Sequence, residues 1–491
     1  MGTAAWSPTQ ARTAGLRTVI VGGGPAPEDN QVAIERNVHY VSRLLPSGSP
    51  RYVLFANGNP AAKTVVFEAP AARSPGELPF ALLFGEREDA APVELRFRTP
   101  AIGKLDGPST RAGVTGAFDW LRKSTPDPVL LYVTGHGSAA KDRNLENNVI
   151  DLWGGEQLSV RELASHLATL PADVPVTLVM VQCYSGAFAN LVFSGGDPKA
   201  PPVRRQIAGF FAATQDRMAA GCTPEVNEAE YQDFSSYFFA ALTGRDRVGR
   251  PVTGADYNKD GRVGMDEAFA YSLGSDHSID VPVCTSDILL RANPAMPDAD
   301  VFKTEYSQAL KWASPAQAAA LQQLSTGLQL TGETRPADAY ALMTRGAPRE
   351  VRTAVGEARR RFQQAKTDAR RPLLARWPEL GSPEAPGFAA ARAKAVPLLA
   401  RSLKEPGIQE LLAADEAMGQ AEEQSYQSQL RQARVLRFVR LVKSVVLGQR
   451  VREGGDPALK ERFEQLVGAE RGTLLPMVSP LPAATGRAAG P

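Results

Sequence analysis

Cysteine and histidine are both scarce in this chain of 491 residues. It contains three cysteines, Cys183, Cys222 and Cys284, and four histidines. Three thiols are too few for a disulfide scaffold. Cys222 and Cys284 could either pair, which would leave Cys183 as the odd thiol, or remain as small buried residues. No histidine stands at metal-ligand spacing from a cysteine, so we expect no zinc site.

The chain also lacks a strong net charge and a long apolar run. A net charge of +2, with 22% charged residues, gives no reason to expect binding to nucleic acid. No stretch approaches the roughly eighteen apolar residues of a transmembrane helix, so we expect no membrane span. Residues 1–15 lack the apolar core of a signal peptide. The protein is therefore either cytoplasmic or exported, with its signal peptide absent from this numbering.

The length of the chain and the change of its residue pattern along the sequence predict more than one domain. Between residues 16 and 297, short apolar strands alternate with amphipathic helices, which predicts an α/β domain with a mostly parallel sheet. From about residue 298 the strand signals vanish. Ala, Gln, Arg, Glu and Leu at helical spacing then predict an all-α region over residues 298–475. We expect residues 1–15 to be an N-terminal extension and residues 476–491 to be a flexible tail.

Two buried-strand patterns are followed by residues capable of nucleophilic catalysis. Residues 128–134 are mostly apolar and lead into a glycine, His136 and a second glycine, Gly137. Residues 176–181 form another apolar run and lead into Cys183. Because neighbouring parallel strands end at the same edge of a sheet, we expect the imidazole and the thiol to lie close together. The imidazole can take the proton of the thiol, and backbone N–H groups at Gly137 and Cys183 could face an oxyanion.

The residues around this pair resemble a known enzyme family. The segments Thr134-Gly135-His136-Gly137 and Gln182-Cys183-Tyr184-Ser185-Gly186 are similar to the His-Gly and Cys motifs of the caspase–haemoglobinase cysteine peptidases, in particular legumain-like and bacterial caspase-like members. The opening GGGPAPEDNQVAIERNV also resembles the first strand and helix of such bacterial proteins. The resemblance covers about residues 16–290. It implies a caspase-like α/β/α sandwich, a catalytic pair of His136 and Cys183, Gly137 as an oxyanion donor, and no organic cofactor.

The residues that would select the substrate are less well defined. Gln182 stands where the family often has an acidic residue before the nucleophile. In similar enzymes the segment 213–220 helps to line the pocket for the P1 residue of the substrate. An inward-pointing Asp216 would favour Lys or Arg at P1, because a buried carboxylate needs a cationic partner. An inward-pointing Arg217 would favour an acidic P1 residue. Alternatively, both are solvated loop charges that pair with each other.

A second motif, a run of twelve residues that begins at Asp256, fits the EF-hand calcium loop. Asp256, Asn258 and Asp260 supply side-chain oxygens at loop positions one, three and five, and a glycine follows at the sharp turn. Arg262 offers its carbonyl at position seven, and Glu267 can bind bidentately at position twelve. The motif predicts one structural Ca²⁺ ion, although the preceding Gly-rich stretch is a poor entering helix. The alternative is an Asp/Asn turn that caps the following helix.

Two functions therefore follow from the sequence. The first is a cysteine endopeptidase that acts on protein or peptide substrates through a thioester acyl-enzyme. Exposed linkers at residues 194–205 and near residue 298 would be sites of self-processing. The alternative is a catalytically inactive caspase-like scaffold that binds protein partners through its helical region. We expect the arginine-rich faces of that region to be solvated rather than bound to nucleic acid.

Overall fold

The computed structural model describes residues 15–46, 48–87, 92–123, 127–454 and 456–474. The expected N-terminal extension, apart from Gly15, and the expected tail lie outside these residues. The chain forms two compact units. The first comprises residues 1–67, 97–344 and 433–491, and the second comprises residues 68–96 and 345–432.

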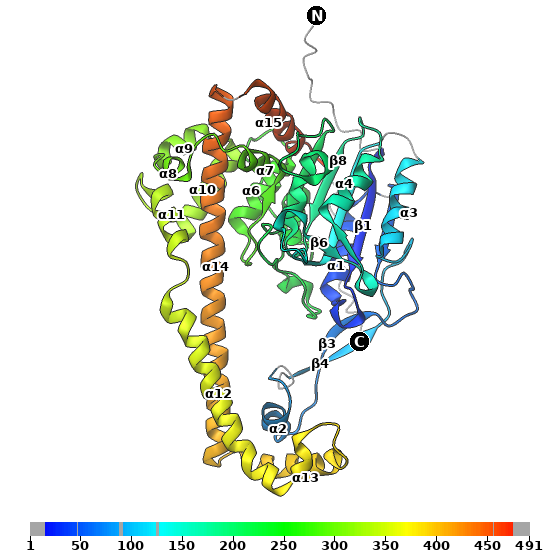
Figure 1. The fold of residues 1–491 in the computed structure, drawn as a ribbon, viewed down its shortest axis with the longest axis vertical. Coiled ribbons are helices and arrows are strands. Elements are labelled where there is room, and N and C mark those ends of the chain that lie inside the picture. Colours follow the sequence, from blue (N-terminus) through cyan, green and yellow to red (C-terminus); the bar gives the residue numbers. More distant parts are fainter. Residues whose placement is uncertain (1–14, 47, 88–91, 124–126, 455, 475–491) are drawn as a thin grey trace, which may run out of the picture. The chain divides into compact units, whose positions relative to one another are not determined.

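The first unit is built on a mostly parallel sheet (Figure 1). Its main strands run in the order β10-β9-β8-β5-β1-β2, and β10 alone is antiparallel to its neighbour. In chain order these are β1 (Arg17–Gly23), β2 (Arg51–Phe55), β5 (Val129–Ser138), β8 (Val176–Met180), β9 (Ile207–Phe211) and β10 (Val283–Cys284). Two short antiparallel strands, β6 (Val149–Asp151) and β7 (Gln157–Ser159), extend the sheet from the end of β5. The predicted α/β class with a mostly parallel sheet is confirmed.

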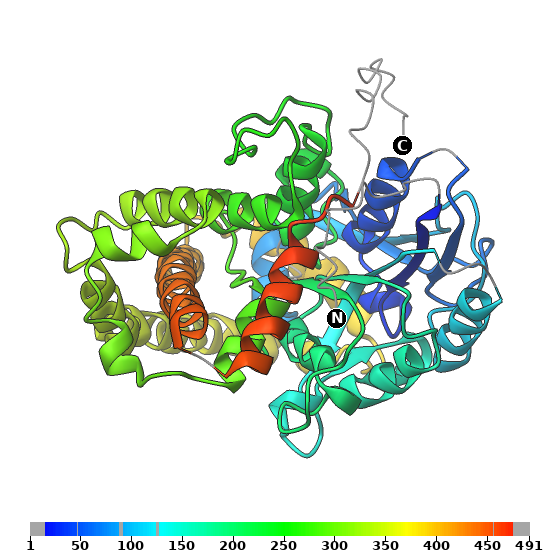
Figure 2. The same ribbon diagram turned by 90° about the horizontal axis from the view of Figure 1, so that it is seen from above.

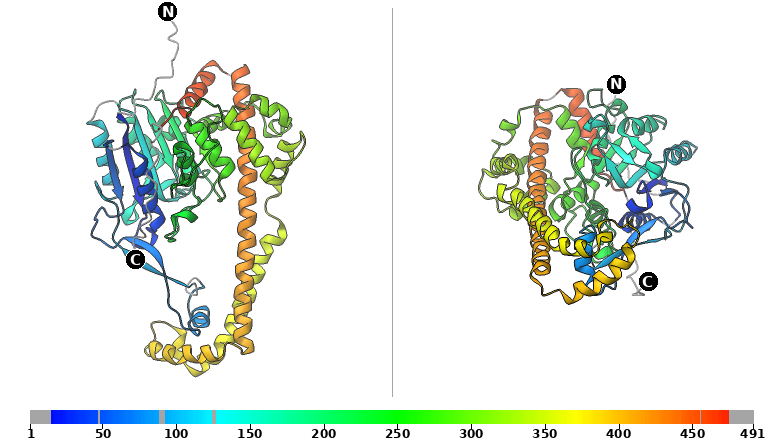
Figure 3. Two further views of the ribbon diagram at one scale, coloured as in Figure 1. Left: turned by 180° about the vertical axis from the view of Figure 1, so that it is seen from behind. Right: turned by 60° about the horizontal axis from the view of Figure 1, so that its bottom comes forward.

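Helices cover both faces of this sheet (Figures 2 and 3). Side chains alternate along a strand, so Val19 and Val21 of β1 join one apolar cluster while Ile20 joins the other. The first cluster includes α3 (Arg111–Arg122), α4 (Val160–Ala168) and α7 (Thr285–Ala292). The second includes α1 (Val32–Leu44), α5 (Phe234–Thr243) and α6 (Met265–Ser275). Helix α4 begins with a capping box, in which Ser159 and Glu162 are bonded reciprocally.

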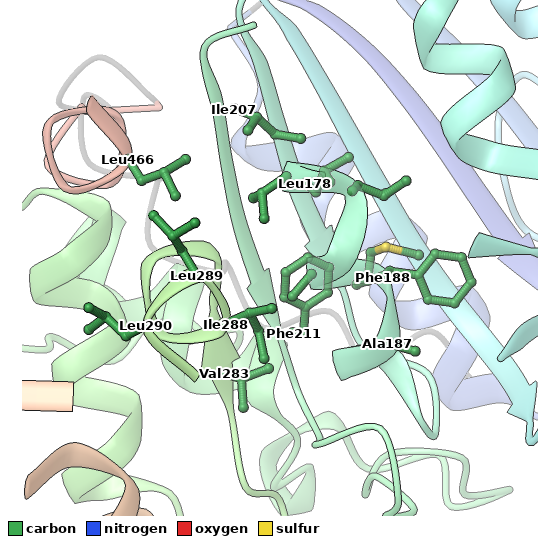
Figure 4. Close-up of a cluster of buried hydrophobic side chains, with 14 of the residues drawn as sticks. Leu178, Ala187, Phe188, Ile207, Phe211, Val283, Ile288, Leu289, Leu290 and Leu466 are labelled. Atoms are coloured by element: carbon green, nitrogen blue, oxygen red, sulfur yellow. The ribbon is translucent and has the colours of Figure 1, made fainter. Parts of the chain in front are cut away.

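Strands β8 and β9 pack against helices that come later in the chain (Figure 4). Leu178 and Phe211 lie in one buried cluster with Leu289 of α7 and Leu466 of α15 (Pro457–Glu470). The same cluster takes in Phe438 from the C-terminal part of the long helix α14 (Pro406–Gly454). One core therefore joins the sheet to helices from the far end of the sequence.

The helices after residue 297 divide between the two units, so the structure places the boundary differently from the expected one at residue 298. The first unit also contains α8 (Asp298–Val301), α9 (Tyr306–Trp312), α10 (Pro315–Gly327) and most of α11 (Arg335–Arg345). The predicted helical character is confirmed, because no strand follows β10 among the described residues.

The second unit has its own small core. It consists of α2 (Glu77–Phe84), α12 (Arg349–Arg376), α13 (Phe388–Arg401) and the N-terminal part of α14. Phe80 of α2 packs with Phe362 of α12 and Leu411 of α14. Arg87 adds an ion pair to Asp415, with Nε 2.5 Å from Oδ1. Two further strands, β3 (Val65–Pro70) and β4 (Val93–Arg98), form a separate two-stranded sheet.

Within the described part of the chain, no helix is both long enough and apolar enough to cross a lipid bilayer.

Candidate active site

Neighbouring strands bring the two predicted catalytic residues to one edge of the sheet. In the parallel pairing of β5 with β8, Val133 lies opposite Met180, and the Val181 N–H donates to the Val133 carbonyl at 3.0 Å. His136 and Cys183 each follow three residues after the last paired position. β5 continues beyond its predicted end at residue 134, because β6 pairs with residues 136–138.

The glycine after His136 is required by a close approach of the two chains. A Cβ atom at Gly137 would lie 2.3 Å from the Cys183 carbonyl oxygen and 2.8 Å from Cγ of Gln182. The backbone that carries the imidazole is therefore in contact with the backbone that carries the thiol. This contact is the strongest evidence that the two motifs form one site.

The imidazole of His136 is oriented by the turn that follows β1. Its Nε2 lies 2.8 Å from the Asp29 carbonyl oxygen and 3.0 Å from Oε1 of Gln31. A carbonyl oxygen can only accept a hydrogen bond, so we assign the proton to Nε2. Nδ1 is then the basic nitrogen, and among the described residues it has no hydrogen-bond partner.

Asp29 and Gln31 were not identified from the sequence. The one signal was the glycine run after β1. A Cβ atom at Gly24 would lie 2.0 Å from the Asp29 carbonyl oxygen, so the turn closes tightly only with glycine. This glycine run serves to place a carbonyl against the imidazole.

Cys183 stands at a sharp turn between β8 and the short helix η6 (Ser185–Val192). Tyr184 adopts a left-handed backbone conformation with φ of 60°, which is uncommon for a bulky residue. Ser185 Oγ accepts a hydrogen bond from the Ala213 N–H at 3.2 Å. A Cβ atom at Gly186 would lie 2.6 Å from the Ala213 carbonyl oxygen. The turn is therefore packed tightly onto the end of β9.

The thiol of Cys183 is half-buried and contacts the backbone of Ala219. Sγ accepts a hydrogen bond from the Ala219 N–H at 3.3 Å and lies 3.8 Å from the Ala219 carbonyl oxygen. Burial raises the pKa of Cys183, and the Ala219 N–H opposes this effect. The thiol is thus protonated at rest and needs a base. Its own N–H donates to no backbone carbonyl among the described residues, so it is free to face a substrate.

A second thiol lies beside the His motif. Sγ of Cys222 is 3.6 Å from the Gly135 carbonyl oxygen. Burial, followed by the proximity of Cys183, raises the pKa of Cys222. All three cysteines are free thiols, so the pairing of Cys222 with Cys284 is not formed. Cys222 was not assigned to the site from the sequence, although its electrostatic coupling to Cys183 places it nearby.

The predicted specificity residues lie in different environments. Gln182 is fully buried, and neither atom of its amide group has a hydrogen-bond partner among the described residues. Asp216 is exposed and accepts a hydrogen bond from Thr214 Oγ1 at 2.5 Å, so it does not point inward. Arg217 is half-buried, and its carbonyl accepts a hydrogen bond from the Tyr184 N–H at 2.8 Å. Burial lowers the pKa of Arg217, while Asp216 partly restores it.

The predicted calcium loop is folded by hydrogen bonds from its own side chains. Asp256 Oδ2 accepts from the Gly261 N–H at 3.0 Å, and Asn258 Oδ1 accepts from the Asp260 N–H at 2.8 Å. Asp260 Oδ1 accepts from the Arg262 N–H at 2.9 Å. Gly261 has φ of 86°, which fits the sharp turn at loop position six. The Gly-rich stretch was expected to be a poor entering helix, and no helix lies between α5 and the loop among the described residues.

Glu267 is nearly buried in the first turn of α6 and points back to the loop. Its Oε1 accepts from the N–H groups of Tyr257 and Asn258, both at 2.9 Å. Among the described residues, the acidic side chains are not gathered into a metal-binding group. However, Oδ1 of Asp256 is buried and has no partner there, so one oxygen of the loop remains open to a cation.

A cavity of about 320 Å³ lies elsewhere in the first unit. Its walls come from α6, α7, α10, α14 and α15, and they include neither His136 nor Cys183. The residues at the sheet edge and this cavity are therefore separate features.

Comparisons with known proteins add little to this picture. No family model matches the chain, and no curated protein matches its sequence. A crystal structure of protein GSU0716 from Geobacter sulfurreducens is similar with a TM-score of 0.31 and 13% sequence identity. The match covers 55% of this chain and 92% of that one.

Proposed function

We propose that the protein is a cysteine endopeptidase with a caspase-like α/β/α fold. The observation that supports this most is the contact between Gly137 and the Cys183 carbonyl, which joins the His and Cys motifs at one sheet edge. His136 is held by the Asp29 carbonyl with its Nδ1 available as a base. The resemblance of both motifs to the caspase–haemoglobinase peptidases supports the same chemistry.

In the proposed reaction, His136 Nδ1 takes the proton of the Cys183 thiol as Sγ attacks the carbonyl carbon of the scissile peptide. The N–H groups of Gly137 and Cys183 stabilise the negative charge on the carbonyl oxygen. His136 then returns the proton to the leaving amine, which leaves a thioester on Sγ. Water attacks the thioester with His136 again as base, and the acid product leaves the regenerated thiol.

Covalent labelling tests this proposal. We expect a peptidyl electrophile to modify Cys183 and to block cleavage of a fluorogenic peptide library, while Cys183→Ala loses both properties. Cys222→Ala is the matched control, because its thiol lies next to the His motif without the turn geometry of Cys183. Absence of both labelling and cleavage would favour the alternative of an inactive scaffold that binds partners through its helices.

The same proposal includes a preference at P1. Arg217 is the more buried member of the Asp216–Arg217 pair, and its Nε has no hydrogen-bond acceptor among the described residues. A substrate carboxylate could supply that acceptor, so we expect an acidic residue at P1. Parallel assays with Asp, Asn and Arg at P1 test it. Faster cleavage after Arg, or equal cleavage after all three, argues against this role of Arg217.

We further propose that the loop starting at Asp256 holds one structural Ca²⁺ ion. Asp256, Asn258, Asp260 and Glu267 would bind it through side-chain oxygens and Arg262 through its carbonyl. The unpartnered Oδ1 of Asp256 supports this. Calorimetry should show that Ca²⁺ binds to the native chain and that Asp260→Ala abolishes the heat. Binding that is unchanged by the substitution rules out this loop as the site.

A further inference from the structure

A loop of five residues, 276–280, follows the end of α6 and precedes β10. We refer to it as the acidic loop. It carries Asp276 at one end and Asp280 at the other. The side chains of both residues are fully or almost fully buried. Such a loop is unusual, because buried carboxylates are costly unless each has a partner.

Arg437 of α14 binds the acidic loop from one side. Its Nε and Nη1 donate to the carbonyl oxygens of Asp280 and Asp276, both at 2.6 Å, and its Nη2 donates to the Ser278 carbonyl at 2.9 Å. Nη2 also lies 3.2 Å from Oδ2 of Asp276, and both side chains of this ion pair have no exposed surface. One guanidinium group therefore holds the carbonyl groups of three alternate residues of the loop and one of its carboxylates.

The acidic loop binds the active-site segment from its other side. Asp280 Oδ1 accepts from the Ala220 N–H at 2.6 Å, and Oδ2 accepts from the Phe234 N–H at 3.1 Å. Ala220 is covalently joined to Ala219, whose N–H donates to Sγ of Cys183. A path of hydrogen bonds and covalent bonds thus connects α14 to the thiol.

We infer that Arg437 is a positioning residue for Cys183, which acts through the acidic loop and Asp280 to hold the Ala219 N–H against the thiol. The inference rests on the proposed role of Cys183. It gives the long helix α14 a part in catalysis, although Arg437 is more than 250 residues away from Cys183 in the sequence. A ligand or partner that displaced this part of α14 would lower the reactivity of Cys183.

The pH profile of Cys183 alkylation by iodoacetamide, resolved by peptide mass spectrometry, tests this inference without requiring cleavage. If the thiolate loses its hydrogen bond from the Ala219 N–H, the midpoint of the alkylation profile should rise by about one pH unit. Arg437→Lys keeps the charge but loses the fork of donors, and should show this shift together with a roughly tenfold slower alkylation near pH 7.5. Arg434→Gln is the matched control. Arg434 lies one turn earlier on α14 and donates to His277 on the outside of the same loop.

A second variant guards against misfolding. Asp280→Asn leaves α14 untouched and replaces one acceptor by a donor, so it should show the same upward shift in a chain whose far-UV circular dichroism is native. A native-like Arg437→Lys or Asp280→Asn protein with the wild-type midpoint overturns the inference. A shifted midpoint in a protein that cleaves no peptide keeps the positioning role and rejects only the proposed peptidase.

A separate observation concerns the cavity of about 320 Å³. Its walls are mixed: Phe210, Phe269, Trp312 and Phe463 line it together with aliphatic side chains, and most of the other lining residues are polar or charged. Each arginine in the lining has a carboxylate partner: Arg437 pairs with Asp276, Arg440 with Asp287, Arg452 with Glu464 and Arg471 with Asp266. Glu470 also lines the cavity, and among the described residues no Lys or Arg pairs with it.

We propose that this cavity binds an amphipathic amine, with Glu470 as the partner of the ammonium group. The carboxylate of Glu470 accepts hydrogen bonds only from Thr285 and Ser286, which carry no charge. A buried carboxylate without a cation is stabilised by a cationic ligand, and the aromatic walls suit an apolar body. This proposal is independent of the peptidase activity.

Three probes of similar shape distinguish the outcomes: 2-phenylethylamine, 2-phenylethanol and phenylacetate. We expect only the amine to raise the melting temperature and to quench tryptophan fluorescence. Glu470→Gln should abolish this response, and Glu464→Gln, at the rim of the same cavity, should retain it. A response to none of the probes, or to all three alike, overturns the proposal.

Discussion

Replacing Glu470 by Gln should change how the stability of the protein depends on pH. Glu470 lies at the end of α15 and is 5% exposed. Its Oε1 accepts from Thr285 Oγ1 at 2.6 Å and from the Ser286 N–H at 2.7 Å, and its Oε2 accepts from Ser286 Oγ at 2.7 Å. Burial nevertheless raises the pKa of Glu470 from 4.5 to about 7, because these donors do not replace the lost hydration.

The sign of the effect follows from proton binding. Between pH 4.5 and about 7 the unfolded chain has released the proton of Glu470 while the folded chain keeps it. The free energy of unfolding therefore falls as the pH rises through this window. Outside the window, Glu470 does not change the pH dependence of stability. A pKa shift of this size corresponds to a loss of about 3 kcal/mol in the free energy of unfolding. Gln cannot lose a proton, and its amide can still bond to Thr285 and Ser286.

Urea denaturation followed by circular dichroism at pH 5, 6, 7 and 8 measures this difference. We compare the free energy of unfolding of Glu470→Gln with that of wild type at each pH. From pH 5 to pH 8 this difference should change by about 3 kcal/mol in favour of the variant. Glu464→Gln on the same helix is the control. Glu464 is a surface partner of Arg452, so its difference should stay within about 0.5 kcal/mol. A flat difference for Glu470→Gln would refute the reasoning that burial governs this carboxyl group.

Three further substitutions have clear expected outcomes. Gly137→Ala should abolish peptide cleavage and lower the melting temperature, because the new Cβ would meet the Cys183 carbonyl oxygen at 2.3 Å, whereas Gly103→Ala, with no atom within 4 Å, should match wild type. Asp287→Asn should cost about 3 kcal/mol in urea denaturation, because it leaves the guanidinium groups that it binds without a buried counter-charge. Those guanidinium groups hold the pKa of Asp287 well below its usual range, so this contribution should fade as the pH falls below about 4. Ser159→Ala should cost about 1 kcal/mol through loss of the α4 cap, measured in the same way.

The sheet and the meeting of the two motifs could be predicted because each depends on local patterns. Apolar runs define β5 and β8, and parallel strands that are neighbours end at the same edge. These features need only strand periodicity. The close approach of the two backbones at Gly137 was not predicted.

The environments of His136 and Cys183 could not be predicted from the same patterns. The carbonyl of Asp29 orients His136, and the backbone of Ala219 contacts the thiol of Cys183. Backbone groups are present at every residue, so the sequence carries no mark of which one is used. Similarly, Asp216 and Arg217 are adjacent charges in the sequence, and only the path of the chain decides that the first is exposed and the second half-buried.

The domain boundary illustrates the same limit on a larger scale. A change of composition near residue 298 marks the end of strands, but it does not mark the end of a core. Leu289 shares a cluster with Phe438 and Leu466, and Arg437 is the buried partner of Asp276. A chain that ended at residue 297 would expose that apolar surface and leave a buried carboxylate without its cation. The sheet that carries His136 and Cys183 therefore depends for its stability on helices that composition alone assigns to a different domain.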